Sequence, residues 1–157
     1  MPQQAMNIPA ARDAFDFAAL SAHMTAAPPA ADPLLGDYTG TILAIAGFQR
    51  LPHALRAPIT RMACAIGQPL WRGKRFHATD GTNMWLSGRH PRTFAGYACA
   101  TADDGHTILD YDQPRNPRPL RGITGELAEL GPGILLGAMY LTIGRRRATL
   151  LYFTLER

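Results

Sequence analysis

Long apolar runs and cysteines are both scarce in this 157-residue chain. No apolar stretch approaches the ~20 residues that a membrane-spanning helix needs. The two cysteines, Cys64 and Cys99, are too few for a disulfide framework. The first residues lack a basic segment followed by an apolar core, so no signal peptide is predicted. We therefore expect a cytoplasmic protein with reduced thiols and no membrane span.

Several catalytic motifs are also missing. The chain has neither a P-loop nor a Gly-x-Gly-x-x-Gly turn that opens a helix, which argues against nucleotide chemistry. Its two serines, Ser21 and Ser87, lie outside any Gly-x-Ser-x-Gly elbow, so a serine hydrolase is not expected. The five histidines are scattered, without the spacing of metal ligands. We expect no metal and no cofactor.

Lysine occurs once, as Lys74, although the net charge is +4 and the chain has fifteen arginines. Three of these arginines form the run 145–147, where a hairpin turn is expected. No aromatic interleaving or recognition helix accompanies this run, so we favour a solvated turn over a phosphate-binding patch. We expect no nucleic-acid partner.

Helical spacing is confined to two segments. Phe17, Leu20 and Met24 form an amphipathic pattern between Pro9 and about Ala26. A second helical pattern covers residues 51–66. We interpret residues 1–30 as a tail and helix that covers one end of a larger body. Residues 31–157 would form a β-barrel domain with a helical insertion near 51–66.

The remaining residues alternate between apolar and polar at strand spacing, with turn signals between the segments. The expected strands are 41–46, 70–78, 83–86, 92–101, 106–112, 120–130, 134–143 and 148–156. About eight strands with short connections are typical of an antiparallel sheet that closes into a barrel. The predicted fold class is therefore mainly β, an antiparallel barrel with one or two N-terminal helices.

Two segments carry a family resemblance. Gly36-Asp37-Tyr38-Thr39-Gly40 resembles the Gly-x-Trp-x-Gly signature of the bacterial GXWXG family, with Tyr38 in place of tryptophan. Residues 71–76 are similar to that family's Trp-x-Gly-Lys-x-Phe segment, and 110–112, 136–139 and 153–157 to the region that usually follows it. The family has no settled activity, so this resemblance implies a compact β-rich fold. The same opening is similar to lipocalin and calycin barrels, which implies that Tyr38 closes one end of the barrel.

The single lysine is the most distinctive chemical group. Both faces of strand 70–77 carry charge, so alternation leaves open whether Lys74 points into the barrel. If it does, near Asp110 or Glu126, burial would lower its pKa and the carboxylate would oppose that shift. Such a lysine could act as a Schiff-base nucleophile or a general base. We favour the alternative, a structural pair between the lysine and a carboxylate.

The carboxylates and aromatic residues complete the candidate site. Asp110 and Asp112 share a strand face; we favour Asp110 as a catalytic group and expect Asp112 to pair with Arg115, Arg118 or Arg121. The candidate catalytic residues are Lys74, Asp110, Glu126 and His77. The candidate ligand contacts are Trp71, Phe76, Trp85, Tyr97, Tyr111, Arg121 and Tyr140.

Three functions remain open on this pattern. The first is binding of a small, mostly apolar organic molecule in a barrel pocket, with a few charged groups that orient it. The second is a cofactor-independent lyase, isomerase or cyclase that uses acid–base catalysis in the same barrel. The third is a non-catalytic interaction module, such as a homodimer through an exposed edge strand.

Overall fold

The computed structural model describes residues 16–31, 33–47, 52, 55, 70–85 and 92–157. Within these ranges lie the helix α2 (Phe17–Ala26) and the short 3-10 helix η2 (Arg118–Leu120). Eight strands complete the fold. They are β1 (Gly36–Ile45), β2 (Trp71–Phe76), β3 (Asp80–Trp85), β4 (Arg92–Thr101), β5 (Thr107–Asp110), β6 (Ile123–Gly131), β7 (Ile134–Ile143) and β8 (Arg146–Glu156).

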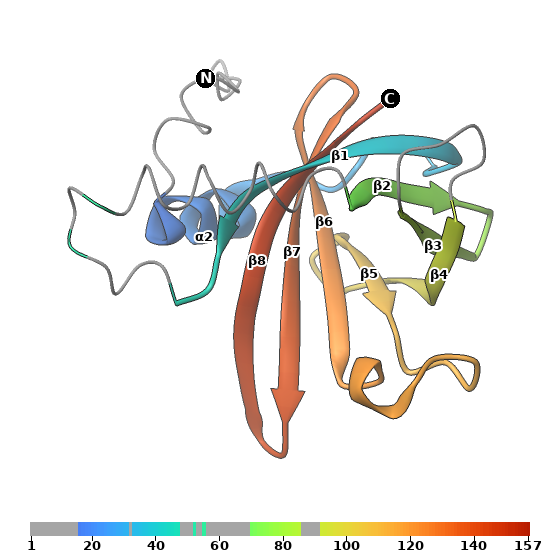
Figure 1. Cartoon of the computed structure of the whole chain (residues 1–157). Coiled ribbons are helices and arrows are strands. Elements are labelled where there is room, and N and C mark those ends of the chain that lie inside the picture. Colours follow the sequence, from blue (N-terminus) through green and yellow to red (C-terminus); the bar gives the residue numbers. More distant parts are fainter. Residues whose placement is uncertain (1–15, 32, 48–51, 53–54, 56–69, 86–91) are drawn as a thin grey trace.

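These strands form a closed antiparallel barrel (Figure 1). Each strand pairs with the next in the chain, and β8 returns to pair with β1, where Thr39 lies opposite Glu156 and Ile45 opposite Leu151. The predicted fold class is therefore confirmed. Eight strands enclose an interior that side chains can fill or that can hold one small ligand.

The strand boundaries agree with the sequence pattern at β4 and β7, whose residue ranges match the expected ones. β1 begins earlier than expected, so the Gly36–Gly40 motif lies within the strand. The helical insertion predicted near 51–66 lies outside the described residues, apart from positions 52 and 55. Residues 9–15 of the predicted N-terminal helix are likewise outside them. No helix among the described residues is both long and apolar enough to span a membrane.

A chain of packed aromatic rings runs into the interior from the end of the barrel at which Tyr38 lies. Tyr38 packs edge-on against Phe76, with the ring centroids 5.3 Å apart. Phe76 contacts Tyr97 at 5.7 Å, and Tyr97 contacts Tyr111 at 5.3 Å. All four side chains are buried. Tyr38 is thus a structural residue at this end of the interior.

Helix α2 lies against the outer wall of the barrel rather than over one end, which corrects the sequence expectation (Figure 1). Its buried residues Leu20 and Met24 pack on apolar side chains of β1, β6, β7 and β8 that point away from the interior. Phe17 adds an edge-on contact with Tyr152, at a centroid distance of 4.9 Å. Burial of each aliphatic side chain contributes ~1.5–3 kcal/mol, enough to hold a short helix on the wall.

A β-bulge in β2 decides which residues face the interior. The register with β3 shifts between Trp71 and Gly73, and Gly73 has φ 138°. A Cβ on Gly73 would lie 2.0 Å from the carbonyl oxygen of Tyr38, so only glycine fits there. The extra residue brings Trp71 and Lys74, three positions apart, onto the same inner face. The question that alternation left open is therefore answered: Lys74 points inward.

Candidate functional site

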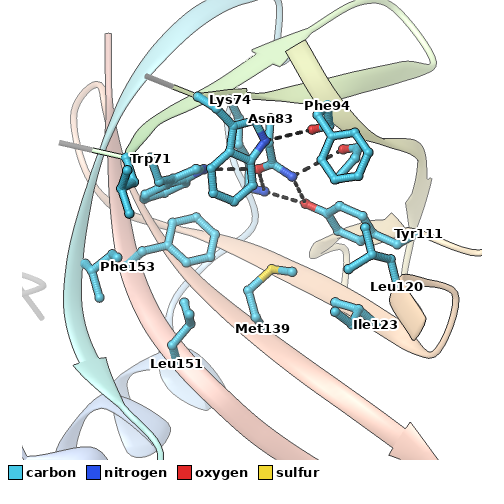
Figure 2. Close-up of a pocket in the computed structure, with 14 residues that line it drawn as sticks. Trp71, Lys74, Asn83, Phe94, Tyr111, Leu120, Ile123, Met139, Leu151 and Phe153 are labelled. Carbon is cyan, nitrogen blue, oxygen red and sulfur yellow. Dashed lines mark hydrogen bonds between the residues drawn. The ribbon is translucent and has the colours of Figure 1, made fainter. Parts of the chain in front are cut away.

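A cavity of about 410 Å³ occupies the half of the barrel opposite the Tyr38 end (Figure 2). Its lining includes the last residue of β3, Trp85, and the first residue of β6, Ile123, together with residues from within β1, β7 and β8. Leu70 and Phe94, each 53% exposed, border its mouth. The rest of the wall is almost wholly apolar and includes Ile42, Trp71, Trp85, Leu120, Ile123, Met139, Leu151 and Phe153.

The amine, amide and hydroxyl side chains of the cavity form one cluster in its wall (Figure 2). Lys74, only 1% exposed, donates from Nζ to Asn83 Oδ1 at 2.7 Å and to the Tyr111 hydroxyl oxygen at 2.5 Å. Asn83 Oδ1 also accepts from Trp71 Nε1 at 3.1 Å. The Asn83 amide nitrogen donates to the Ala95 carbonyl at 3.2 Å and to Tyr111 at 3.0 Å. The oxygen and the nitrogen of the Asn83 amide are therefore both hydrogen-bonded within the protein, and Asn83 fixes the position of Lys74 Nζ.

Lys74 has no carboxylate partner within ion-pair distance among the described residues. Burial, which disfavours the charged ammonium, lowers its pKa from 10.5 to about 7. Aromatic rings partly compensate for the lost hydration. The Nζ atom lies 5.0 to 5.8 Å from the ring centroids of Trp71, Tyr97, Tyr111 and Phe153. The lysine is thus poised to gain or lose its proton near neutral pH.

Tyr111 is the second chemically useful group of the cluster. Its hydroxyl oxygen faces two donors, Lys74 Nζ and the Asn83 amide. Burial raises its pKa, so the phenol keeps its proton at neutral pH. When Lys74 is charged, neither of these partners can accept that proton, and it remains available to a molecule in the cavity.

Several residues expected from the sequence do meet at this site. Lys74, Trp71, Trp85 and Tyr111 line the cavity. Tyr97 places its ring against Lys74 but donates its hydroxyl proton to the Arg75 carbonyl. Phe76 belongs to the aromatic packing at the Tyr38 end and does not line the cavity.

The expected carboxylate partners of Lys74 are not there, which corrects that part of the prediction. In β5 and β6 the residues Leu109, Gly125 and Leu127 face the interior. Adjacent residues of a strand point to opposite faces, so Asp110 and Glu126 point to the outer side. Asp110 Oδ1 accepts from the backbone N–H of Asp112 at 2.9 Å. The structural pair between Lys74 and a carboxylate, which the sequence favoured, is therefore wrong.

Three further site residues also lie away from the cavity. His77 is exposed just after β2 and borders a separate open cleft. Arg121 donates to the carbonyls of Pro114 and Asn116 and so holds the turn before β6. Tyr140 lies on the outer face, where the Arg147 guanidinium stacks 3.6 Å from its ring centroid. None of the ion pairs among the described residues involves Asp112, so its expected pairing with arginine is not formed.

Glu126 instead holds a histidine beneath the end of α2. His106, 3% exposed, contacts Glu126 Oε1 through Nδ1 at 2.8 Å and the Ala27 carbonyl through Nε2 at 2.9 Å. Burial lowers the His106 pKa, but these two acceptors and the nearby Asp104 outweigh it and raise the pKa overall. Asp104, His106 and Glu126 have donor atoms close enough together to hold a metal ion. Both ring nitrogens already face acceptors, however, and the contact fastens α2 to the wall.

Asn83 is the functional residue that sequence reasoning missed. In β3 it shares a face with Gly81 and Trp85 by strand alternation. The sequence did contain a signal for Asn83: it is a polar residue on the same strand face as Trp85, which was expected to line the pocket. The apolar wall residues from η2, β6, β7 and β8 were also missed, because nothing separates them from ordinary core side chains in the sequence.

Comparisons with known proteins address the fold alone. No protein-family model matches the chain, so the resemblance to the GXWXG family stays a hypothesis. No curated protein matches it either. A solved structure described as "crystal structure of protein from Thermomonospora curvata" superposes with a TM-score of 0.61 at 19% identity, covering 96% of this chain and 93% of that one. The two proteins share a fold. At this identity the similarity carries no information on ligand or activity.

Proposed function

We propose that this protein binds a small, mostly apolar organic molecule inside the barrel, with the polar end of that molecule at Lys74. The observation that carries the proposal is a buried lysine without a carboxylate partner among the described residues, in the wall of an apolar cavity. A volume of about 410 Å³ falls within the ~300–1,000 Å³ of small-molecule sites. The few convergent polar groups would fix the ligand's orientation.

The apolar wall would supply most of the affinity. A ligand that buries about 300 Å² of apolar surface gains ~7 kcal/mol at ~25 cal/mol per Å². Part of this gain offsets the freedom lost on association. The cluster of Lys74, Asn83 and Tyr111 adds directional bonds, which select among molecules of similar apolar area.

The chain carries its own reporters of occupancy. Its two tryptophans, Trp71 and Trp85, both line the cavity. We expect intrinsic fluorescence to change saturably when decanoate or decan-1-ol is added. Native mass spectrometry of protein purified from its own host should show a retained small molecule.

A pair of matched variants tests the place of binding. Met139→Trp puts a large ring into the cavity, whereas Ile143→Trp makes the same kind of change at a side chain that is 70% exposed and outside the cavity. Calorimetry should show that the first variant loses binding of both compounds and the second retains it. Absence of binding by the unaltered protein, or equal binding by the two variants, would contradict the proposal.

One observation supports cofactor-independent acid–base catalysis as a second function. Lys74, whose pKa is about 7, lies beside a phenol that keeps its proton. A neutral amine could accept a proton from a bound molecule while Tyr111 donates one. Lys74 and Tyr111 would thus take the acid–base role that the sequence analysis assigned to Lys74 with Asp110 or Glu126. Turnover would appear as conversion of the host-derived molecule during incubation, lost in Lys74→Met.

The third hypothesis has no support from the strands. Each of the eight described strands has a hydrogen-bonded neighbour on both sides, so none of them is an edge strand that a homodimer could extend. A cytoplasmic location stays a prediction from the sequence.

A further inference from the structure

We propose that the ligand is an organic monocarboxylic acid, with its apolar body against the cavity wall and its carboxylate on Lys74 Nζ and the Tyr111 hydroxyl. This inference rests on the proposed function and narrows it to one class of molecule. It is carried by the hydrogen-bonding groups of the cluster and by the balance of charge around them.

The cluster offers donors to the cavity and lacks acceptors. A charged lysine has three N–H groups, of which two are directed to Asn83 and Tyr111. The third N–H and the Tyr111 proton have no acceptor within the cluster. Asn83 Oδ1 already accepts two hydrogen bonds, and the Asn83 amide donates two. A ligand head group that accepts two hydrogen bonds therefore fits, and a carboxylate does so with its two oxygens.

Charge selects a monoanion among the acceptors. Lys74 is the only cation among the described residues that line the cavity, so one negative charge balances it. A phosphate monoester would bring a second charge without a partner, and an amine would place two cations together in an apolar space. An alcohol could accept one hydrogen bond but would leave the buried ammonium unpaired. The aromatic rings around Nζ stabilise the charged state in which the acid would bind.

Binding of an acid should therefore be coupled to protonation of the lysine. In the free protein the lowered pKa of Lys74 leaves much of the amine neutral at neutral pH. A bound carboxylate raises that pKa, so each acid molecule takes up a proton as it binds. With a free pKa of about 7, affinity for an acid falls about 30-fold from pH 6 to pH 8.5. Affinity for an uncharged molecule of the same length should not change over this range.

Calorimetry with decanoate and decan-1-ol tests this directly on the unaltered chain. Titrations at pH 6.0 and 8.5 give the pH dependence, and titrations at pH 8 in two buffers of different ionisation enthalpy give the proton uptake. We expect about 0.9 proton per decanoate bound at pH 8 and none for decan-1-ol. Two variants locate the effect. Lys74→Met should abolish the pH dependence for decanoate, whereas Arg72→Met, which removes a cation from the exposed side of the same strand, should keep it.

The outcomes separate this inference from the function on which it rests. Tighter binding of decanoate at pH 6 with proton uptake supports the inference. If both compounds bind and decanoate shows neither pH dependence nor proton uptake, the acid class is wrong while the binding function stands. If neither compound binds, the binding function fails together with the inference. The comparison on the unaltered protein decides among these outcomes even if Lys74→Met does not fold.

Discussion

Replacement of Lys74 by methionine should make the protein more stable at neutral pH, by an amount that shrinks as the pH rises. The lysine is buried, and burial lowers its pKa from 10.5 to about 7. Between these values the unfolded chain binds a proton that the folded protein releases. Stability of the natural chain must therefore increase with pH across this window. Lys74→Met lacks this dependence because methionine carries no proton, yet its length and flexibility suit the same space.

The magnitude follows from the pKa difference. The fall of the Lys74 pKa from 10.5 to about 7, at ~1.4 kcal/mol per pH unit, amounts to about 5 kcal/mol of destabilisation below pH 7, and less than about 1 kcal/mol remains at pH 10. Loss of the two hydrogen bonds made by Nζ offsets part of the gain, by about 1–3 kcal/mol. That offset does not depend on pH. The difference in unfolding free energy between variant and natural chain should thus fall by ~1.4 kcal/mol per pH unit between about pH 7.5 and pH 10.

Urea unfolding of both proteins at pH 7, 8, 9 and 10 measures this difference. Every other titrating group is common to the two chains, so their subtraction isolates Lys74. Arg72→Met is the matched control, since it removes an exposed cation from the same strand and should leave the pH profile parallel to that of the natural chain. A constant difference between Lys74→Met and the natural chain from pH 7 to pH 10 would refute the claim that Lys74 is buried without a counter-ion.

Two further predictions concern the frame of the site. Gly73→Ala should cost about 3 kcal/mol or more, measured by denaturant unfolding, because its Cβ meets the Tyr38 carbonyl and its φ is positive. Gly131→Ala, whose Cβ has no neighbour within 4 Å, should change stability by only about 0.5 kcal/mol, and equal losses would contradict the bulge. The contact of His106 with Glu126 stabilises the fold fully below the unfolded pKa of 6.5, and this contribution is lost as pH rises through the raised folded pKa. The stability difference between the natural chain and His106→Gln should therefore shrink above pH 6.5, and a difference that grows instead would show that the ring is held neutral.

The barrel could be predicted from the sequence because its evidence is local. Alternation at residues 92–101 and 134–143, with turn residues between segments, identifies each strand separately, and β4 and β7 have those bounds. The place of helix α2 could not be predicted in this way. Its apolar stripe shows that one face is buried, and the surface that covers that face is assembled from four strands distant in the sequence.

The site was only partly predictable for two physical reasons. First, the bulge at Gly73 breaks the period of two, so Trp71 and Lys74 share the interior although alternation separates them. Second, the polar residues Asp110 and Glu126, which alternate with apolar residues in their strands, were assigned to the pocket. The apolar residues beside them in the sequence form the inner face instead. A barrel of this size buries its apolar face by default, and only a residue held by specific partners, as Lys74 is by Asn83, departs from that rule.

The protonation of Lys74 can be measured on its own amine, which shows whether this side chain is buried without a counter-ion. Because the chain has one lysine, protein labelled with ¹⁵N-lysine gives one side-chain amine signal by NMR. We expect a midpoint near pH 7 in the free protein and a higher midpoint when decanoate is bound. A midpoint near the ordinary value of 10.5, unchanged by decanoate, would show that the lysine is solvated or already paired and would contradict the proposed site.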